Sequence, residues 1–189
     1  MHDAALALVA AIPEPASVLE VGCANGWRLA LLQERYGAAC CGCDVSEAAI
    51  ADGRERYPDV FLSLAAAHYM LYRDKAFDVV IFSFVLHWID RPRLASVIAE
   101  ADRVLAPGGH LIVVDFLPLW PTKRRYHHRQ DVEAWTYKQD YAACWLSLGT
   151  YTQRRRILFN HDTGEPGVCD AGAQAAGVLL RKEEAYTCA

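Results

Sequence analysis

The sequence predicts an α/β fold with a doubly wound, mostly parallel sheet of seven strands and helices on both faces. Short apolar runs alternate regularly with helix-like segments over the first 116 residues. These runs are nearly continuously apolar, which is typical of parallel strands that are buried on both faces. Two more strand-like runs follow at residues 154–162 and 177–183, and they could pair as an antiparallel edge.

Length and composition suit one globular domain with its own core. The chain has 189 residues, of which 53% are hydrophobic and 22% are charged. Its net charge of −4 gives no general attraction to nucleic acid or to an anionic membrane. No apolar run approaches the ~18 residues that a membrane span requires. Residues 1–12 carry Asp3 and lack a basic start, so we expect an opening helix rather than a signal peptide.

The chain contains seven cysteines, an odd number without a CxxC pair. The run "CCGCD" at 40–44 leaves open a site for a soft metal ion. Small buried residues on a strand, in a reducing compartment, explain the run better. We therefore expect no metal and a cytoplasmic protein.

The first half of the chain is expected to contain three strands and two helices. Gly37 ends the first helix, and Ser46 is a suitable N-cap for the second. In order, the predicted elements are strand 17–22, helix 27–36, strand 38–45, helix 47–57 and strand 60–65.

The second half begins with a strand at 77–83 that is rich in β-branched and aromatic residues. A helix over 92–105 has proline in its first turn and stops at "APGG", before a strand at 110–116. Residues 117–140 then show no clean period, and a short helix is expected within 140–149.

The stretch "VLEVGCANG" at 18–26 places a glycine-rich turn after the first strand. In open α/β sheets, ligands bind outside the carboxyl ends of the strands, and glycines let them approach the backbone. Asp44 ends the second strand 22 positions after Gly22, the spacing at which an acid can hold ribose hydroxyls. A ribose-containing cofactor is the first hypothesis.

The turn does not match the motifs that bind phosphates. Ala24 replaces the middle glycine of G-x-G-x-x-G, and no G-x-x-x-x-G-K-[ST] loop exists. Glu20 would repel a pyrophosphate, but it suits a ligand with an ammonium group. S-adenosylmethionine has that group, a ribose and a sulfonium, and it has no phosphate.

Four motifs in order resemble those of the class I S-adenosylmethionine-dependent methyltransferases, which have a Rossmann-like fold. They are "VLEVGCANG", "CGCDVS", "KAFDVVIFSFVLHWID" and "IAEADRVLAPGGHLIVVDF", and the resemblance covers about residues 15–116. It implies a single methyltransferase domain with a cofactor-binding half at 1–116. Residues 117–148 would form a cap over the acceptor site, and residues 149–189 the terminal antiparallel strands.

The resemblance also implies a cofactor site. Glu20 and the backbone of the turn would surround the methionine end, and Asp44 would take both ribose hydroxyls. The acid that normally meets the adenine amino group would fall near Ala66 and is therefore missing. The implied cofactor-binding residues are Glu20, Gly22, Cys23, Gly26, Trp27, Asp44, Val45, Ala67, His68, Ser83 and Phe84.

Methyl transfer from a sulfonium mainly requires alignment of the reactants and exclusion of water. A base is needed only if the acceptor keeps its proton at neutral pH. His87, just after the fourth strand, either orients or deprotonates the acceptor or is a helix-start histidine bonded to backbone. Trp88 beside it is either a core residue or part of the acceptor site.

The segment "PTKRRYHHRQDVEAWTYKQDY" at 121–141 is the best candidate acceptor site, unless it is a solvated basic loop. Arginines can hold phosphate or carboxylate groups, and aromatic rings can stack on a ring. Tyr126 and His127 are expected to point inward and, with His87, are the candidate catalytic residues. The expected substrate-binding residues are His87, Trp88, Arg125, Tyr126, His127, His128 and Tyr137.

The leading hypothesis is methylation of an oxygen or nitrogen of a small anionic or ring-bearing metabolite, which leaves S-adenosylhomocysteine. We expect no membrane or nucleic-acid partner, and a monomer or homodimer. One alternative is an RNA- or protein-modifying methyltransferase that uses the basic segments 123–129 and 154–156. The arginines at 154–156 could instead guard an edge strand. A non-catalytic cofactor-binding protein is the third possibility.

Overall fold

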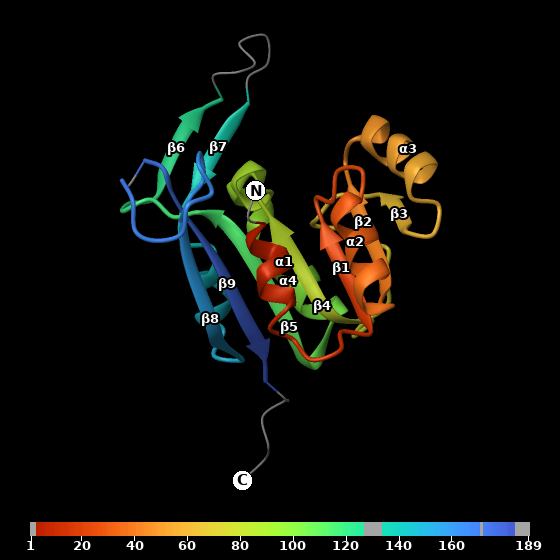
Figure 1. Cartoon of the computed structure of the whole chain (residues 1–189). Helices are drawn as coiled ribbons and strands as arrows, with labels where there is room; N and C mark the ends of the chain where they lie inside the picture. The colour runs from red at the N-terminus through yellow and green to blue at the C-terminus, as the bar shows by residue number, and fades with distance from the viewer. Residues whose placement is uncertain (1–2, 127–133, 171, 184–189) are drawn as a thin grey trace.

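A seven-stranded sheet in the order β3-β2-β1-β4-β5-β9-β8 forms the centre of the protein (Figure 1). The computed structural model describes residues 3–126, 134–170 and 172–183. Strands β1 to β5 pair in parallel, whereas β9 runs antiparallel to both β5 and β8. The predicted fold class and the antiparallel terminal strands are confirmed. The strands are β1 Ser17–Val21, β2 Ala39–Asp44, β3 Phe61–Leu64, β4 Phe77–Ser83, β5 Leu105–Phe116, β8 Tyr151–Asn160 and β9 Gln174–Lys182.

Helices cover both faces of the sheet because the strands are apolar on both sides. Val79 and Ile81 of β4 pack in one buried cluster with residues of α1, α2 and α3. Val80 and Phe82 point the other way, into a cluster with residues of α4 and α5. None of the helices in the described ranges is long and apolar enough to cross a membrane. The helices are α1 Ala4–Val9, α2 Trp27–Tyr36, α3 Glu47–Arg56, the 3₁₀ helix η1 Leu86–Trp88, α4 Arg91–Val104 and α5 Ala142–Leu146.

The strand order reverses between β1 and β4. The chain first builds outward from β1 to β2 and β3, then returns to place β4 on the other side of β1. Connections that diverge from two adjacent strands leave a crevice at their carboxyl ends, which is where α/β sheets bind ligands. The glycine-rich turn at 22–26 and the segment 84–90 after β4 lie at this crevice.

A two-stranded hairpin, which the sequence pattern did not reveal, stands above the end of the sheet to which β5 points (Figure 1). It consists of β6 Thr122–Arg125 and β7 Trp135–Lys138, paired antiparallel. Its strands have four residues each. β6 is polar on both faces, and the alternation of Trp135 and Tyr137 with polar residues in β7 is too short to mark a strand. No residue of either strand belongs to the two buried clusters.

Two connections differ from what the sequence suggested or left open. Strand β5 already begins at Leu105, which pairs with Phe77 before the register shifts, so "APGG" lies inside the strand. Between β3 and β4, residues 65–76 contain no helix. Arg103 of α4 holds this segment by donating to the carbonyl oxygens of Tyr72 and Met70 at 2.7 and 2.9 Å. This anchored loop forms one wall of the site.

Candidate functional site

The turn after β1 has left-handed backbone angles that residues with a side chain rarely adopt. Gly22 and Gly26 have φ angles of 73° and 77°, in the region that favours glycine. A Cβ atom on Gly22 would lie 2.4 Å from Cγ2 of Val85, so Gly22 also lets the segment after β4 approach closely. Ala24, in place of the middle glycine, adopts φ 49°. The departure from the motif therefore changes the residue but keeps the left-handed backbone.

Four amide groups of this turn already donate hydrogen bonds within the protein. The N–H groups of Gly22 and Cys23 both donate to the carbonyl oxygen of Cys43, at 2.8 and 3.1 Å. The amide of Ala24 donates to Asp44 Oδ2 at 2.8 Å, and that of Gly26 to the carbonyl of Cys23 at 2.9 Å. A phosphate-binding turn must offer free N–H groups. These four cannot serve that purpose, which argues against a phosphate-bearing cofactor at the turn.

Asp44 joins the turn to the end of β2. Besides the bond from Ala24, its Oδ1 accepts the amide of Ser46 at 2.9 Å. A carboxylate has about four lone-pair positions, so both oxygens can still accept hydroxyl groups. Asp44 thus stabilises the turn and presents acceptors to a ligand.

Glu20 is a buried acid with a hydrogen-bond partner, within the described part of the chain, for only one of its two carboxylate oxygens. One carboxylate oxygen accepts a hydrogen bond from Arg28, which also pairs with Asp3 at 2.9 Å. Among the described residues, none supplies a hydrogen-bond partner for the other oxygen, Oε2. Burial raises the pKa of Glu20 to about 7, although the nearby Arg28 guanidinium opposes the rise. A ligand ammonium would supply both the missing donor and the missing charge.

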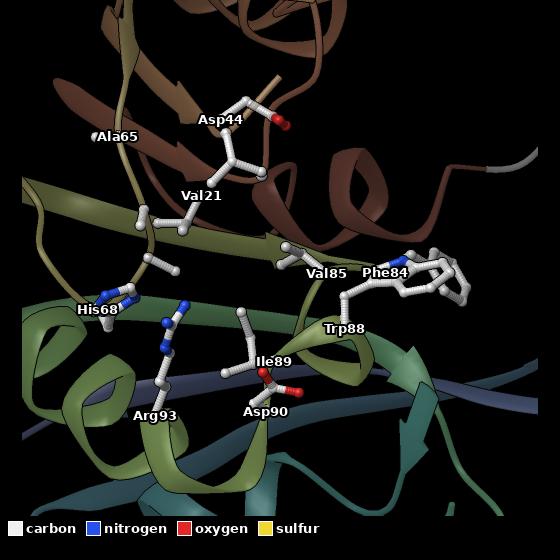
Figure 2. A pocket seen from close by; sticks show the side chains of 14 residues that line it. Val21, Asp44, Ala65, His68, Phe84, Val85, Trp88, Ile89, Asp90 and Arg93 are labelled. Carbon is white, nitrogen blue, oxygen red and sulfur yellow. The ribbon is translucent and has the colours of Figure 1, made fainter. Parts of the chain in front are cut away.

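A cavity of about 480 Å³ opens at the reversal of the strand order (Figure 2). In the view of Figure 2, Asp44 and Val21 are drawn at one end of it and His68 and Arg93 at the other. Phe84 and Trp88 form a further side. The lining residues are Val21, Gly22, Asp44, Val45, Ala65, Ala66, Ala67, His68, Phe84, Val85, Trp88, Ile89, Asp90 and Arg93.

A second cavity of about 280 Å³ lies on the other side of Phe84, which lines both. Its walls include Trp27, Arg28, Ser83, Phe159 and residues 161–164. Phe84 has φ 53°, an uncommon value for a bulky residue, and its amide donates to the carbonyl of Val114 at 2.8 Å. Such strain is often found at ligand sites. Here it holds an aromatic ring as the partition between the two cavities.

His87 is held by Asp115, at the carboxyl end of β5. Its Nδ1 lies 2.9 Å from Asp115 Oδ1, and its amide donates to Asp115 Oδ2 at 3.2 Å. The imidazole is buried, with the rings of Phe116 and Trp88 at 4.8 and 5.1 Å between centroids. His87 lines neither of the two cavities described above. Because Asp115 engages Nδ1, Nε2 is the ring nitrogen that faces away from this carboxylate.

The hairpin packs on this aromatic group through one of its faces. Tyr126 meets Trp88 edge to face, with ring centroids 4.7 Å apart. Lys138 places its Nζ 3.5 Å from the centre of the Phe116 ring. Burial and the charge of Arg124 lower the pKa of Lys138, while Asp115 and Asp162 oppose that change. The hairpin therefore brings two cations, Lys138 and Arg124, to the carboxyl end of β5.

The structure brings several predicted residues together and separates others. Of the predicted set, one group lines the larger cavity: Gly22, Asp44, Val45, Ala67, His68, Phe84 and Trp88. Trp27, Ser83 and Phe84 line the smaller one. Glu20, Cys23, Gly26 and His87 line neither and support the site from behind. Tyr126, Arg125 and Tyr137 lie on or beside the hairpin, whereas His127 and His128 fall outside the described residues.

The sequence reasoning overlooked a number of residues at the site. Arg93 and Asp90 reach the larger cavity from the start of α4, where the sequence predicted only a helix with proline in its first turn. Asp115 could have been found, because an acid that ends a buried parallel strand points to the ligand edge of the sheet. Lys138 and Arg124 share the hairpin face that meets the site, and only the pairing of β6 with β7 reveals this.

The cysteine run lies on β2 and the arginine run on β8. No group of three or more His, Cys, Asp or Glu side chains within the described ranges is arranged to hold a metal ion. Burial raises the pKa of Cys40, Cys41 and Cys43, as expected for packing residues. On the edge strand β8, Arg154 pairs with Glu183 and Arg156 with Asp140.

The site fits S-adenosylmethionine on observations of the chain itself. A phosphate would find the amide groups at the turn already bonded, whereas Glu20, behind the turn, has one oxygen without a partner among the described residues, which suits an ammonium. Asp44 keeps acceptors for ribose hydroxyls. The larger cavity continues past Asp44 to the alanines at 65–67, where a purine has room.

Comparisons with known proteins agree with this geometry. The family model described as a methyltransferase domain matches residues 19–113. Trans-aconitate 2-methyltransferase of Variovorax paradoxus is 34% identical over 103 residues, which is 54% of this chain and 39% of that protein. Demethylmenaquinone methyltransferase of Beutenbergia cavernae is 34% identical over 104 residues, 54% of this chain and 42% of that protein. The chain thus spans about two fifths of the length of these curated relatives.

Solved structures share the fold over nearly the whole chain. One is a Burkholderia thailandensis 1,6-didemethyltoxoflavin-N1-methyltransferase with bound 1,6-didemethyltoxoflavin and S-adenosylhomocysteine. It superposes with a TM-score of 0.75 at 18% identity, covering 96% of this chain and 77% of that one. At this identity the likeness shows the fold alone.

Proposed function

The chain belongs to the methyltransferase domain family, and from this premise we propose that it transfers a methyl group from S-adenosylmethionine to an oxygen or nitrogen of a small acceptor. The acceptor is anionic or bears a ring. The observation that carries the proposal is the cavity at the strand-order reversal, with Asp44 at one end and the half-satisfied Glu20 behind the turn. Relatives named for trans-aconitate and demethylmenaquinone support a small-molecule acceptor.

In this proposal, residues 1–116 hold the cofactor. S-adenosylmethionine, when bound, supplies a methyl group that is already activated by its sulfonium. Asp44 accepts the ribose hydroxyls, and Glu20 accepts the ammonium of the methionine end near Arg28. Ser83 and Phe84 flank the reacting centre, since Phe84 separates the two cavities. The turn residues Gly22, Cys23 and Gly26 act through backbone shape, because their amides are already bonded.

Residues 117–148 cover the acceptor, and residues 149–189 complete the sheet. The inward face of the hairpin supplies Lys138 and Arg124, which suit a carboxylate or another anionic group. Trp88 and Tyr126, already in edge-to-face contact, offer aromatic surface for a ring. The same hairpin excludes water from the methyl-transfer step.

His87 is proposed to orient the acceptor or to remove its proton, with Tyr126 and His127 as the other candidates. Asp115 fixes the imidazole through Nδ1, so Nε2 is the nitrogen available to an acceptor. A base helps only if the acceptor holds a proton at neutral pH, as a hydroxyl or a ring N–H does. Carboxylate acceptors would need only alignment.

The first experiment is calorimetric titration with S-adenosylmethionine and S-adenosylhomocysteine. Wild type and Asp59→Asn, an exposed change distant from the cavity, should bind equally well, whereas Asp44→Asn should bind at least tenfold more weakly. Asparagine keeps one oxygen for the turn, so Asp44→Asn tests the ligand contact more cleanly than alanine. A wild type that binds neither compound would refute the proposal.

The acceptor is then sought by transfer of labelled methyl groups to panels of carboxylic acids, phenols and nitrogen heterocycles. Turnover of one class that is lost in Asp44→Asn would identify the acceptor chemistry. Label found only on added RNA or protein would instead favour a macromolecular acceptor. Cofactor binding without turnover of any acceptor would favour a non-catalytic binding protein.

We also propose a cytoplasmic location. All six cysteines in the described ranges are free thiols that are buried or half-buried, and three of them lie on β2, which suits a reducing compartment.

A further inference from the structure

The end of the larger cavity that faces away from Asp44 carries an unusual set of polar groups. Three alanines, Ala65, Ala66 and Ala67, form its wall and contribute no side-chain acceptor. The polar side chains there are His68 and Arg93, which both line the cavity and are drawn at this end of it in Figure 2. Within the described part of the chain, neither makes an ion pair or a side-chain hydrogen bond. Both are therefore available to a ligand.

The two acids of the lining lie elsewhere. Asp44 is engaged with the glycine-rich turn at the opposite end. Asp90 lies on the other side of Ile89 from Arg93 in Figure 2, towards Trp88. A guanidinium only donates hydrogen bonds, and an imidazole donates from at least one nitrogen. This end of the cavity thus offers donors and no carboxylate.

Building on the proposed function, we propose that this end is a purine subsite that accepts a 6-oxo purine about as well as adenine. The 6-amino group of adenine donates hydrogen bonds and finds no charged acceptor here. The 6-oxo group of hypoxanthine accepts them and meets Arg93 and His68, whereas at N1 adenine accepts a hydrogen bond and hypoxanthine donates one, so the two purines gain comparably from these donors. A site that rejects hypoxanthine needs an acceptor placed at the amino group, because discrimination comes from leaving a buried polar group unpaired.

Arg93 is the specificity-determining residue in this arrangement. It reaches the cavity from the first turn of α4, whereas His68 comes from the loop after β3. The two elements are tied together by Glu100, whose Oε2 accepts the amide of Met70 at 2.7 Å. The pair of donors is therefore presented by a connected framework.

The test is calorimetric binding of S-adenosylhomocysteine and S-inosylhomocysteine, which differ at the purine 6-position and in the proton that the inosyl compound carries on N1. Wild type should bind the two with dissociation constants that differ by less than tenfold. Ala66→Asp, which places a carboxylate in the same wall, should favour the adenosyl compound by at least tenfold. Arg93→Met, which keeps side-chain bulk, should weaken the inosyl compound more than the adenosyl one.

Asp44→Asn is the matched control, because a contact to the ribose should affect both compounds alike. Wild type that prefers the adenosyl compound by tenfold or more would overturn the inference and leave the proposed function intact. A ratio of adenosyl to inosyl affinity that is the same in Arg93→Met as in wild type would also overturn the inference. Binding of neither compound to wild type would instead refute the proposed function itself, and the inference with it.

Discussion

At the scale of single residues, Ala24 shows how a motif can change without changing its backbone. It keeps φ 49° where a glycine would be unstrained, and its side chain is exposed. We predict that Ala24→Gly stabilises the protein by about 0.5–1 kcal/mol, because relief of the left-handed strain exceeds the added freedom of the unfolded chain. Urea unfolding measures the change.

The matched control is Ala30→Gly, inside α2, where the backbone is helical. Glycine there should destabilise by about 1 kcal/mol. If both substitutions destabilise by similar amounts, the strain assigned to Ala24 is absent.

Glu20 gives a second residue-scale prediction, which concerns protons. Because its pKa lies at about 7, it is about half protonated at pH 7 before ligand binds. An ammonium beside it favours the charged form, so binding of S-adenosylhomocysteine should release about half a proton at pH 7. Affinity should accordingly strengthen as the pH rises from 6 to 8.

Titration at pH 7 in two buffers with different ionisation enthalpies measures the released proton. In Glu20→Gln, the binding enthalpies measured in the two buffers should be equal. Equal binding enthalpies for wild type in both buffers would show that Glu20 does not meet the ammonium.

At the scale of elements, Asp115 joins η1 to the end of β5. It accepts from the amide of His87, from its Nδ1 and from the amide of Phe116, the last at 2.8 Å. We predict that Asp115→Ala lowers the free energy of unfolding by about 2–3 kcal/mol, because buried donors lose their acceptor. Hydrogen exchange at the His87 amide should accelerate in the same variant.

Asp59→Ala, at an exposed position before β3, is the comparison, with an expected change of about 0.5 kcal/mol or less. A similar small effect of Asp115→Ala would mean that η1 is held by its apolar contacts alone.

The hairpin provides a prediction about acceptor recognition. Lys138 lies on the face that meets Phe116, whereas Lys123 lies on the opposite face against Trp135. For an anionic acceptor found by the labelling screen, Lys138→Met should raise KM by about tenfold, the order expected for loss of a charge-assisted hydrogen bond. S-adenosylhomocysteine affinity should stay unchanged.

Lys123→Met removes the same charge from the other face and should change KM by less than about twofold, as expected for an exposed charge. Equal effects of the two substitutions would show that only the net charge of the hairpin matters.

The sequence predicted the sheet well because each of its parallel strands carries its own signal. The run at 77–83 is apolar on both faces, and glycine, serine and proline mark the limits of its neighbours. The hairpin gave a weaker signal, since β6 is polar on both faces, the aromatic face of β7 consists of Trp135 and Tyr137 alone, and the pairing of the two strands depends on tertiary contacts. Arg93 was missed because its place at the larger cavity depends on how α4 crosses the sheet. The strained φ of Phe84 is also invisible in the sequence.

For the whole molecule, the exposed edge strand β8 is the main place where the sheet could pair with another chain. Strand β8 closes the sheet, and residues 152–156 are exposed along it. Charged side chains on an edge strand oppose pairing with another chain. We predict that replacing Arg154, Arg155 and Arg156 together by valine causes self-association at concentrations where the wild type does not associate, measured by size exclusion with light scattering.

The triple lysine variant keeps the charge and should behave as wild type. A valine variant that elutes at the wild-type mass would show that the edge is protected by something other than these charges.

The hairpin contributes no residue to either buried cluster, although in the proposed function it supplies the cations that face the acceptor. Substitutions in β6 and β7 should therefore change the free energy of unfolding little, whereas those in β1 or β4 should lower it strongly. Over evolutionary time, acceptor preference can drift on eight hairpin residues while the strands beneath them stay under purifying selection. Descendants of one such chain can thus come to methylate different molecules and still share the same cofactor motifs.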